Sequence, residues 1–308
     1  MFTEQQNLAI VRTELDSVFY QEFEYDSGEP GIATANTGAI FKPLQTEHAQ
    51  YIEEVFMGSG LFPVIGEVQT VPLSTPQVAN KLTTSVKDFA QGIEISKDLF
   101  DDNLHGVWAR AVKDLALKAR VSQDQNAFNF WNKAFTTSLT ADGNAVCSSH
   151  TLIGGATYSN TLGAVALSEP NLNTAILNLR TQPDQRNVVL GNNPSYILVP
   201  PALFKKAIQY TESALIPDVS DNNINVYRSA YGITVYTSPY LSATAGGSDT
   251  AWFLLARNHG VTRLLRQGIE TALRSWEYSN NRTYFYQANF REAVYAADYI
   301  GIVGSSGA

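Results

Sequence analysis

The sequence predicts an α+β fold, because helix and strand patterns are mixed along the chain without the regular alternation of a doubly wound sheet. Two observations carry this prediction. A strand-patterned ribbon at residues 61–98 leads directly into a long helical stretch at 101–135. The carboxy-terminal stretch, residues 270–303, is aromatic and strand-like. Neither the ribbon nor the helix is expected to be stable alone, so both need neighbours.

The ribbon contains two β-patterned runs, residues 62–73 and 83–95, separated by a polar link at 74–81. The link is rich in turn-forming residues. Each run of about 12 residues extends for roughly 40 Å at about 3.3 Å per residue. Because a lone two-stranded hairpin is only marginally stable in water, we expect contacts from outside the hairpin to hold it.

A long helix is predicted from Asp101 to Phe135. Asp101, Asp102 and Asn103 provide N-cap and first-turn chemistry, and no Pro follows before Phe135. At 1.5 Å per residue the helix spans roughly 50 Å. A break into two helices near Ser122 is the alternative, because helices of this length are uncommon. The apolar stripe at helical spacing consists of Leu104, Trp108, Ala111, Leu115, Ala119, Phe128, Trp131 and Phe135.

The amino-terminal stretch is predicted to be a helix followed by an extended arm. Residues 4–20 place apolar side chains on one helical face, and a glycine-rich segment then continues to about residue 50. The apolar face of this helix consists of Leu8, Val11, Leu15 and Val18.

Residues 166–262 are predicted to form a compact α/β lobe, and the long helix with the carboxy-terminal strands is predicted to form a second lobe. The first lobe opens with a helix at Ser168-Glu169-Pro170, an N-cap followed by Pro in the first turn. The other predicted elements are a strand at 196–199, a helix at 202–213, strands at 233–237 and 252–255, and a loop at 243–248.

Composition places the chain among globular proteins. Its 308 residues are 44% hydrophobic, which is enough to bury a sizeable core. The longest apolar runs fall far short of the roughly 20 residues that a membrane span requires, and we expect no export signal. The single cysteine, Cys147, excludes an intramolecular disulfide and favours assembly in a reducing compartment.

The net charge of −8 is unevenly distributed. Residues 1–60 contain ten acidic and two basic side chains, whereas the rest of the chain contains nineteen of each. An acidic segment is usually a solvated face; the alternative is an arm that lies along a neighbouring subunit. No basic stripe of the kind that neutralises phosphates is present, so specific nucleic-acid binding is not expected.

The sequence contains no recognisable catalytic or metal-binding motif. Cys147 and His150 are the only thiol and imidazole at short range, whereas a metal site needs three or four ligands. Ser148-Ser149-His150 lacks the Gly-x-Ser-x-Gly context of a hydrolase. We therefore predict no catalytic residues, no cofactor-binding residues, no metal ligands, no cofactor and no enzymatic activity. The four histidines are scattered at His48, His105, His150 and His259.

Several short segments, in order along nearly the whole chain, resemble one protein family. They are Gly92-Ile93-Glu94-Ile95-Ser96 before the helix, Asp101-Asp102-Asn103-Leu104 at its start, Asp124 within it, Asp142-Gly143 and Ser149-His150-Thr151-Leu152 after it, and, in the central lobe, Pro194-Ser195-Tyr196-Ile197-Leu198-Val199-Pro200-Pro201-Ala202-Leu203 and Tyr231-Gly232-Ile233-Thr234-Val235. This series resembles the tailed-bacteriophage major capsid proteins of the Hong Kong 97 type, and within them the Mu-like major head subunits.

The resemblance implies a Hong Kong 97-like capsid fold with an N-arm, an extended β-hairpin loop (E-loop), a long spine helix, a peripheral domain and a central axial domain. The expected divisions are 1–60 for the N-arm, 61–98 for the E-loop, 99–165 for the spine helix and the first part of the peripheral domain, 166–262 for the axial domain and 263–308 for the second part of the peripheral domain.

The function implied by the resemblance is that of a major capsid protein. Copies of the chain are expected to assemble into hexamers and pentamers of an icosahedral head that encloses double-stranded DNA without specific binding, in a virion assembled in the bacterial cytoplasm. Portal, scaffolding and cement proteins are the further expected partners, and no membrane is involved. The alternatives are an encapsulin-like compartment shell and another phage structural protein, such as a tail component.

Some members of this family join a ribbon lysine covalently to an asparagine. Lys81, Lys87, Asn280 and Asn281 are present here, but no motif assigns them to such a bond. We therefore expect no covalent mesh. By the same resemblance we expect no long amino-terminal prodomain, and we therefore expect scaffolding and any protease to be separate proteins.

Overall fold

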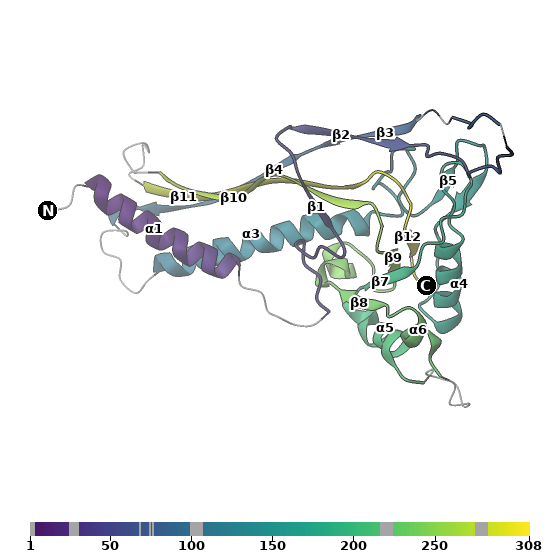
Figure 1. Ribbon diagram of the computed structural model, residues 1–308. Helices are drawn as coiled ribbons and strands as arrows, with labels where there is room; N and C mark the ends of the chain where they lie inside the picture. Colours follow the sequence, from purple (N-terminus) through teal and green to yellow (C-terminus); the bar gives the residue numbers. More distant parts are fainter. Residues whose placement is uncertain are drawn as a thin grey trace.

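The computed structural model describes residues 4–24, 31–67, 69–73, 75, 77–98, 107–215, 224–274 and 283–308. It consists of an elongated part, in which two helices run along a long sheet, and a compact lobe at one end (Figure 1). A two-stranded ribbon lies on the other side of the long sheet and extends toward the lobe. This mixed helix-and-sheet architecture agrees with the predicted α+β class.

The long sheet contains four strands in the order β1-β10-β11-β4. The strands are β1 (Lys42–Gln45), β10 (Val261–Arg274), β11 (Thr283–Ala296) and β4 (Lys87–Ser96). β10, β11 and β4 are antiparallel, whereas β1 pairs in parallel with the start of β10. Alternate residues of β11 are buried, as expected of a strand that has one face on the core. The predicted strand character of 270–303 is confirmed for the described residues.

The long helix α3 (Val107–Asn132) lies along the buried face of this sheet. Its 26 residues span about 39 Å. The helix passes through Ser122 without a break; the Ser122 hydroxyl donates to the Lys118 carbonyl oxygen at 2.7 Å. The single-helix prediction is therefore confirmed over this range, although α3 ends at Asn132 and not at Phe135. The predicted N-cap, Asp101-Asp102-Asn103, and Leu104 lie outside the described residues.

The amino-terminal helix α1 (Glu4–Phe23) confirms the helix predicted at 4–20. It packs on its own chain: Leu15 and Phe19 are buried against Trp108 and Val112 of α3 and Tyr286 of β11. The described apolar side chains of α1 therefore pack on its own chain, and contact of the acidic arm with a neighbouring subunit stays a prediction.

Side chains of α1 also cover the part of β10 that extends beyond β1. The Tyr20 hydroxyl donates to the Ile269 carbonyl oxygen at 3.4 Å, and Arg12 Nη2 donates to the Thr271 carbonyl oxygen at 3.5 Å. The Thr271 hydroxyl in turn donates to Asp16 at 2.7 Å. Backbone groups that an open strand edge would expose are thus bonded on this side of the sheet.

The compact lobe is built on a second four-stranded sheet in the order β12-β9-β7-β8. The strands are β7 (Pro194–Val199), β8 (Thr234–Thr237), β9 (Trp252–Ala256) and β12 (Ile302–Ser305). The three strands predicted in this region are confirmed to within two residues. β9 is buried along its whole length, which explains its continuous apolar sequence.

Helices cover this second sheet. They are α4 (Glu169–Arg180), α5 (Pro201–Glu212) and α6 (Val226–Ala230). The Ser168 hydroxyl caps α4 by accepting from the Asn171 amide, as predicted, and Leu172, Ile176 and Leu179 of α4 are buried. The predicted loop at 243–248 includes the short 3₁₀ helix η3 (Ala243–Ala245), which follows η2 (Pro239–Leu241).

The ribbon differs from its prediction. Its paired strands are β2 (Gln50–Phe56) and β3 (Val78–Ser85), not residues 62–73 and 83–95. The second predicted run divides at Val86 between β3 and β4, which belong to different sheets. A small hairpin of β5 (Ser149–Thr151) and β6 (Thr157–Ser159) lies near the lobe.

The predicted strand at 62–73 is wrong for two physical reasons. A turn interrupts it: the Gln69 amide donates to the Gly66 carbonyl oxygen at 3.3 Å. Pro63 and Pro72 each lack an N–H, so neither limb can complete a ladder of hydrogen bonds with the other.

An aromatic core joins the elongated part to the lobe. Trp131 near the end of α3 is fully buried, and its ring centroid lies 4.9 Å from that of Phe253 in β9. Phe128 of α3 packs edge-on against Phe41 at 5.2 Å. Ile302 of β12 belongs to the same cluster. The end of α3 therefore fixes the lobe relative to the long sheet.

We predict that Trp131→Ala lowers the free energy of unfolding of the subunit by about 3–5 kcal/mol, because it leaves a large cavity where three elements meet. Urea unfolding followed by circular dichroism measures this change. The matched control is Phe62→Ala, at a side chain that is 98% exposed, which should change stability by less than about 0.5 kcal/mol. Equal losses in the two variants would contradict the assignment of this core.

Candidate assembly surfaces

A buried group of polar side chains, which we call the junction cluster, lies between α3 and the long sheet. Its centre is an ion pair between Arg263 of β10 and Glu292 of β11, with Nε and Nη2 of the guanidinium 2.8 and 2.6 Å from Oε2 of the carboxylate. Both side chains are almost completely buried. An ion pair in this setting stabilises only when its remaining polar atoms are also bonded.

Three further residues complete the junction cluster. Asn126 of α3 donates to Glu292 Oε1 at 2.9 Å, and Arg263 Nη1 donates to the Asn36 side-chain oxygen. Asp124 of α3 accepts from the Ala35 amide at 2.6 Å. Burial raises the pKa of Asp124, although the bond from Ala35 and the nearby Arg263 charge oppose this effect. The cluster thus connects two strands, the long helix and the amino-terminal segment.

The same amino-terminal segment is bonded to the lobe. His259 Nε2 lies 2.8 Å from the Ala39 carbonyl oxygen, and the Val261 amide donates to His259 Nδ1 at 3.3 Å. Burial lowers the pKa of His259 to about 4, so the ring is neutral at neutral pH and Nε2 carries the proton given to Ala39. Ala33 and Thr237 add a backbone hydrogen bond at 2.8 Å.

The base of the ribbon, comprising β2 and β3, is attached to the outer face of the long sheet. The Tyr51 ring lies 6.0 Å from that of Tyr295 in β11, and the Tyr295 hydroxyl donates to Glu53. Burial and this hydrogen bond raise the pKa of Tyr295. Across the ribbon, Lys81 Nζ and Glu54 Oε1 are 2.6 Å apart. The base of the ribbon is therefore held by its own chain.

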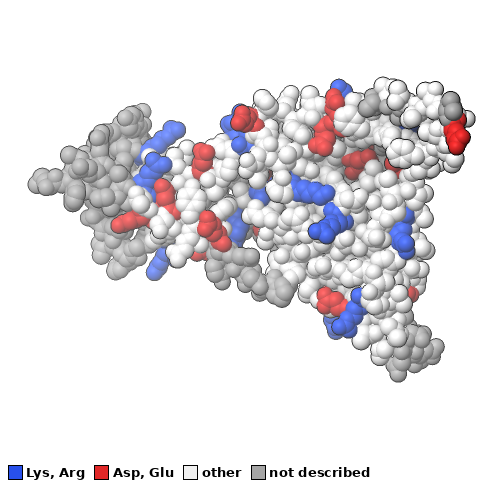
Figure 2. All heavy atoms as spheres, viewed as in Figure 1, with Lys and Arg blue, Asp and Glu red and all other residues white. Residues whose placement is uncertain are grey.

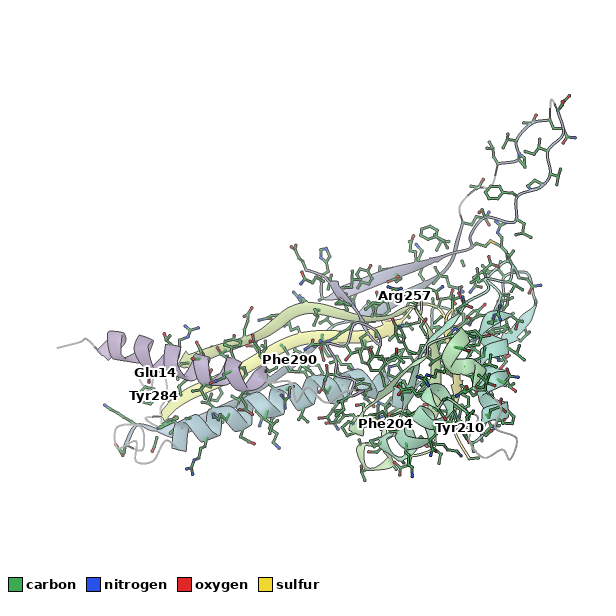
Figure 3. The ribbon with its side chains drawn as sticks, turned by 60° about the horizontal axis from the view of Figure 1, so that its bottom comes forward. Glu14, Phe204, Tyr210, Arg257, Tyr284 and Phe290 are labelled. Carbon is green, nitrogen blue, oxygen red and sulfur yellow. The ribbon has the colours of Figure 1, made fainter. Side chains whose placement is uncertain are left out.

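The ribbon tip, which we define as residues 57–77, projects from this base (Figure 3). Among the described residues, the outermost backbone hydrogen bond between its two limbs joins the Met57 amide to the Gln77 carbonyl oxygen at 2.9 Å. Large apolar side chains beyond this point face solvent. They are Leu61 (78% exposed), Phe62 (98%), Val64 (98%), Ile65 (43%), Val71 (62%) and Leu73 (93%). Exposed apolar groups in such number mark an interaction surface.

Charge is dispersed over the face seen in Figure 2, with acidic and basic side chains interspersed, and the end that carries the ribbon tip is largely uncharged. Neither the basic nor the acidic side chains gather into a stripe on this face. Apolar contact, and not charge, is therefore the main property that the ribbon tip offers to a partner.

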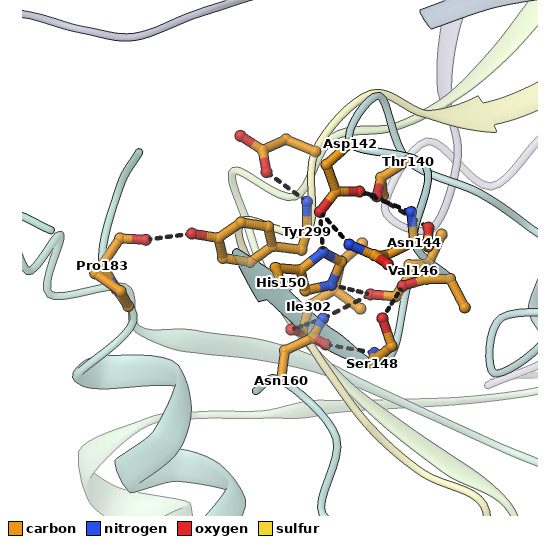
Figure 4. Close-up of polar contacts among 12 residues, drawn as sticks. Thr140, Asp142, Asn144, Val146, Ser148, His150, Asn160, Pro183, Tyr299 and Ile302 are labelled. Carbon is orange, nitrogen blue, oxygen red and sulfur yellow. Dashed lines mark hydrogen bonds and ion pairs between the residues drawn. The ribbon is translucent and has the colours of Figure 1, made fainter. Parts of the chain in front are cut away.

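The turn at Asp142-Gly143 and the segment that follows form a closed polar network (Figure 4). His150 is fully buried, with Nδ1 2.7 Å from Asp142 Oδ2 and Nε2 3.3 Å from the Val146 carbonyl oxygen. Burial by itself would raise the pKa of Asp142, but hydrogen bonds with His150, Thr140 and Asn144 hold it well below its usual value. The histidine is thus bonded on both ring nitrogens, as expected of a structural residue.

The residues weighed for chemistry do not form a reactive group. The Ser148 hydroxyl donates to the Ala145 carbonyl oxygen at 2.7 Å, and no hydrogen bond links it to His150. Cys147 is buried in the aromatic core, and burial raises its pKa, which keeps the thiol protonated. His48 is exposed, and His105 lies outside the described residues.

Two further properties of the described part of the chain bear on its chemistry and location. No group of three or more His, Cys, Asp or Glu side chains there is placed to hold a metal ion. None of the helices in those same ranges has the length and apolar character needed to cross a membrane. Lys81, weighed for a covalent bond, lies in the ion pair with Glu54, whereas Asn280 and Asn281 fall in an undescribed range.

Sequence reasoning did not identify the junction cluster. The sequence signal for it is one charged residue at a core-facing position in each of the two strands, Arg263 in β10 and Glu292 in β11. Such residues are usually read as solvated, and their pairing depends on a strand register that periodicity does not provide.

Comparison with known proteins identifies a family and a shared fold. The sequence profile of the phage capsid protein family matches residues 79–305. The capsid of cyanophage P-SCSP1u is 12% identical, with 92% of each chain covered and a TM-score of 0.58. The mature capsid of bacteriophage PhiM1 is also 12% identical, with 92% of this chain and 90% of that chain covered and a TM-score of 0.59.

A virus-like particle from Pyrococcus furiosus shares the fold as well, at 8% identity, with 95% of this chain and 98% of that chain covered and a TM-score of 0.52. No curated protein sequence matches the chain. At these identities the solved structures show a common fold alone, whereas the profile match extends over most of the chain.

We predict that Glu292→Gln lowers the free energy of unfolding by about 3–5 kcal/mol, because it leaves the buried Arg263 charge without its counter-charge. The matched control is Asp88→Asn, which breaks a solvent-exposed ion pair with Arg291 (2.9 Å) on the same sheet and should cost less than about 1 kcal/mol. Chemical denaturation of both variants measures the difference. Losses of similar size would show that the junction cluster is not a major source of stability.

Proposed function

The chain belongs to the phage capsid protein family, and from this premise we propose that its copies assemble into the hexamers and pentamers of an icosahedral head that encloses double-stranded DNA. The prediction that the chain is a phage capsid protein is confirmed by the profile match. The single observation that carries the proposed mode of assembly is the apolar ribbon tip, whose described large apolar side chains are exposed.

We propose that the fold is of the Hong Kong 97 type. The short segments that resemble the Mu-like major head subunits support the assignment to that subgroup. The proposed divisions remain an N-arm at 1–60, an E-loop at 61–98, a spine and first peripheral part at 99–165, an axial domain at 166–262 and a second peripheral part at 263–308. The length of α3, the compact lobe and the projecting ribbon support this assignment. The one change concerns the boundary between the first two divisions: because β2 is one of the two ribbon strands, we propose that the N-arm ends at Ala49 and the E-loop begins at Gln50.

Assembly of this kind joins different surfaces of identical chains. Contacts between unlike surfaces generate closed rings when the rotation closes, and permanent interfaces commonly bury roughly 2,000–5,000 Å². The ribbon is suited to this role: its base is fixed to the long sheet through Tyr51 and Tyr295, so its tip is presented in a defined direction. Burial of the tip on a neighbour removes its apolar side chains from water.

The remaining expectations are part of the same proposal. The virion is the proposed location, with assembly in the bacterial cytoplasm, and portal, scaffolding and cement proteins are the proposed additional partners. The role is structural, without enzymatic activity, cofactor or covalent mesh. DNA is held by enclosure, which agrees with the interspersed charge on the face in Figure 2.

A second candidate function is a compartment shell that encloses protein cargo. The specific observation in its favour is the similarity to the virus-like particle from Pyrococcus furiosus, which covers 95% of this chain. The profile match favours the phage head over this alternative. A tail component is disfavoured, because the structural similarities described above are to capsids and a virus-like particle.

We predict that removal of the ribbon tip abolishes closed particles without unfolding the subunit. In the variant, an Asn-Gly turn replaces residues 58–76 and joins Met57 to Gln77, which already share a hydrogen bond. Circular dichroism and the urea midpoint should match those of the wild type, whereas negative-stain electron microscopy should show no shells. Ile153→Ser, at an exposed apolar side chain outside the tip, serves as the control and should assemble. Normal particles from the tip-deleted chain would exclude the proposed mode of assembly.

We also predict that particles from the native source contain double-stranded DNA that resists added nuclease until the shell is opened. Absorbance ratios and gel electrophoresis of the extracted contents measure this. Particles that lack DNA and contain a second, non-structural protein would instead support the compartment shell.

A further inference from the structure

A small pocket lies where the ribbon base, the end of the long sheet and the loops beside the lobe meet. Asp298 follows β11, Asp142 lies in the turn after α3, and Gln185 belongs to the loop between α4 and β7. Val55 of β2 and Asn80 of β3 line the pocket from the ribbon side. Segments that are far apart in the sequence therefore contribute side-chain oxygens to one narrow space.

Gln185 places an unused hydrogen-bond acceptor in this pocket. Its side chain is only 5% exposed, and its Oε1 has no hydrogen-bond partner in the described part of the chain. The same side chain hydrogen-bonds to the Asp298 carboxylate, and only its amide nitrogen can donate that bond. Oε1 is thus the atom left over. A buried acceptor without a partner is unfavourable, so it points to a ligand at this position.

The Asp298 carboxylate lacks full compensation for its charge. It accepts from the Tyr299 amide at 2.7 Å. Burial raises its pKa and the like charge of Asp142 adds to this effect, whereas bonds from Tyr299 and Gln185 and the nearby His150 ring oppose it. Asp142 already accepts hydrogen bonds from His150 and from its own turn (Figure 4). Asp142 is therefore a fixed negative charge beside Asp298, and Asp298 is the carboxylate with room for a further partner.

A cation suits this space better than a water molecule does. The pocket is too narrow for water. Ca²⁺ approaches its oxygen ligands to about 2.3–2.6 Å, whereas a hydrogen-bonded hydroxyl or water oxygen stays at about 2.7–2.8 Å. Carboxylate and side-chain amide oxygens are ligands that Ca²⁺ prefers, with backbone carbonyls as further ligands. Mg²⁺ is less suitable, because it usually keeps several of its waters.

We propose that this pocket binds a Ca²⁺ ion through the Asp298 carboxylate and Gln185 Oε1, with Asn80 as a further oxygen ligand and the Asp142 charge beside it. The ion neutralises the buried carboxylates and joins the loop after α4 to the ribbon base and the end of β11. Two of the described lining residues are acidic, so the site differs from the groups of three or more acidic, Cys or His side chains considered above. No local motif marks it, and for this reason the sequence indicates no metal ligand.

A calcium titration of the full-length chain, treated first with EGTA, tests the site. Added CaCl₂ should raise the melting temperature in a saturable way, by about 4 °C at a hundredfold excess over the dissociation constant. MgCl₂ at the same concentrations should give a smaller shift. Gln185→Met, which removes the free acceptor at similar volume, should bind calcium about tenfold or more weakly by isothermal titration calorimetry. Asp298→Asn should lose most of the calcium shift.

The matched control is Asp114→Asn, at an exposed carboxylate of α3 outside the pocket, which should keep the wild-type calcium shift. Without calcium, Asp298→Asn should melt no lower than the wild type, because it removes one of two like charges that lie close together. This reversal separates cation binding from a merely structural role.

A wild-type melting temperature that does not respond to calcium would overturn the site. The same conclusion would follow if Asp298→Asn were equally destabilised with and without calcium, since the variant would then keep the full shift. The proposed function does not depend on this result, because it rests on the ribbon tip and is tested by the tip deletion.

Discussion

The buried ion pair between Arg263 and Glu292 is the constraint on which the elongated part of the molecule depends. Arg263 pairs across the sheet with Val294, so the two charged side chains lie diagonally on the same face. A slip of one residue would turn Arg263 to the opposite face and leave Glu292 buried without a counter-charge. Because Asn126 and Asn36 bond to the same pair, the register of the hairpin also sets the positions of α3 and the amino-terminal segment.

The packed body of the chain and its exposed ribbon tip have complementary roles. The junction cluster, the aromatic core around Trp131 and the contact of Tyr51 with Tyr295 fix the ribbon base relative to the lobe. The prolines at 63 and 72 prevent the two limbs of the tip from pairing with each other. The apolar side chains of the tip consequently remain available for a neighbour, and the geometry of the body determines where they are presented.

Much of the fold could be predicted where a single periodic pattern decides the element. The stripe through α3, the Ser168 cap of α4 and the continuous apolar strand β9 are local signals, and the structure confirms them. The strand prediction at 62–73 was wrong because the β-branched residues around Val64 indicate a strand, whereas a turn at Gly66 interrupts this segment. The packing of α1 on its own chain and the pocket beside Asp298 could not be predicted, since each combines residues from distant elements.

The cover that α1 provides along β10 has a consequence for the newly synthesised chain. A sheet with both edges open can add strands from other molecules at either side and so extend into a fibre. Here Tyr20 and Arg12 of α1 bond to the part of β10 that extends beyond β1, so this stretch of edge is not free to pair with a strand of another molecule. The amino-terminal helix thereby removes one site of unwanted strand pairing from the long sheet.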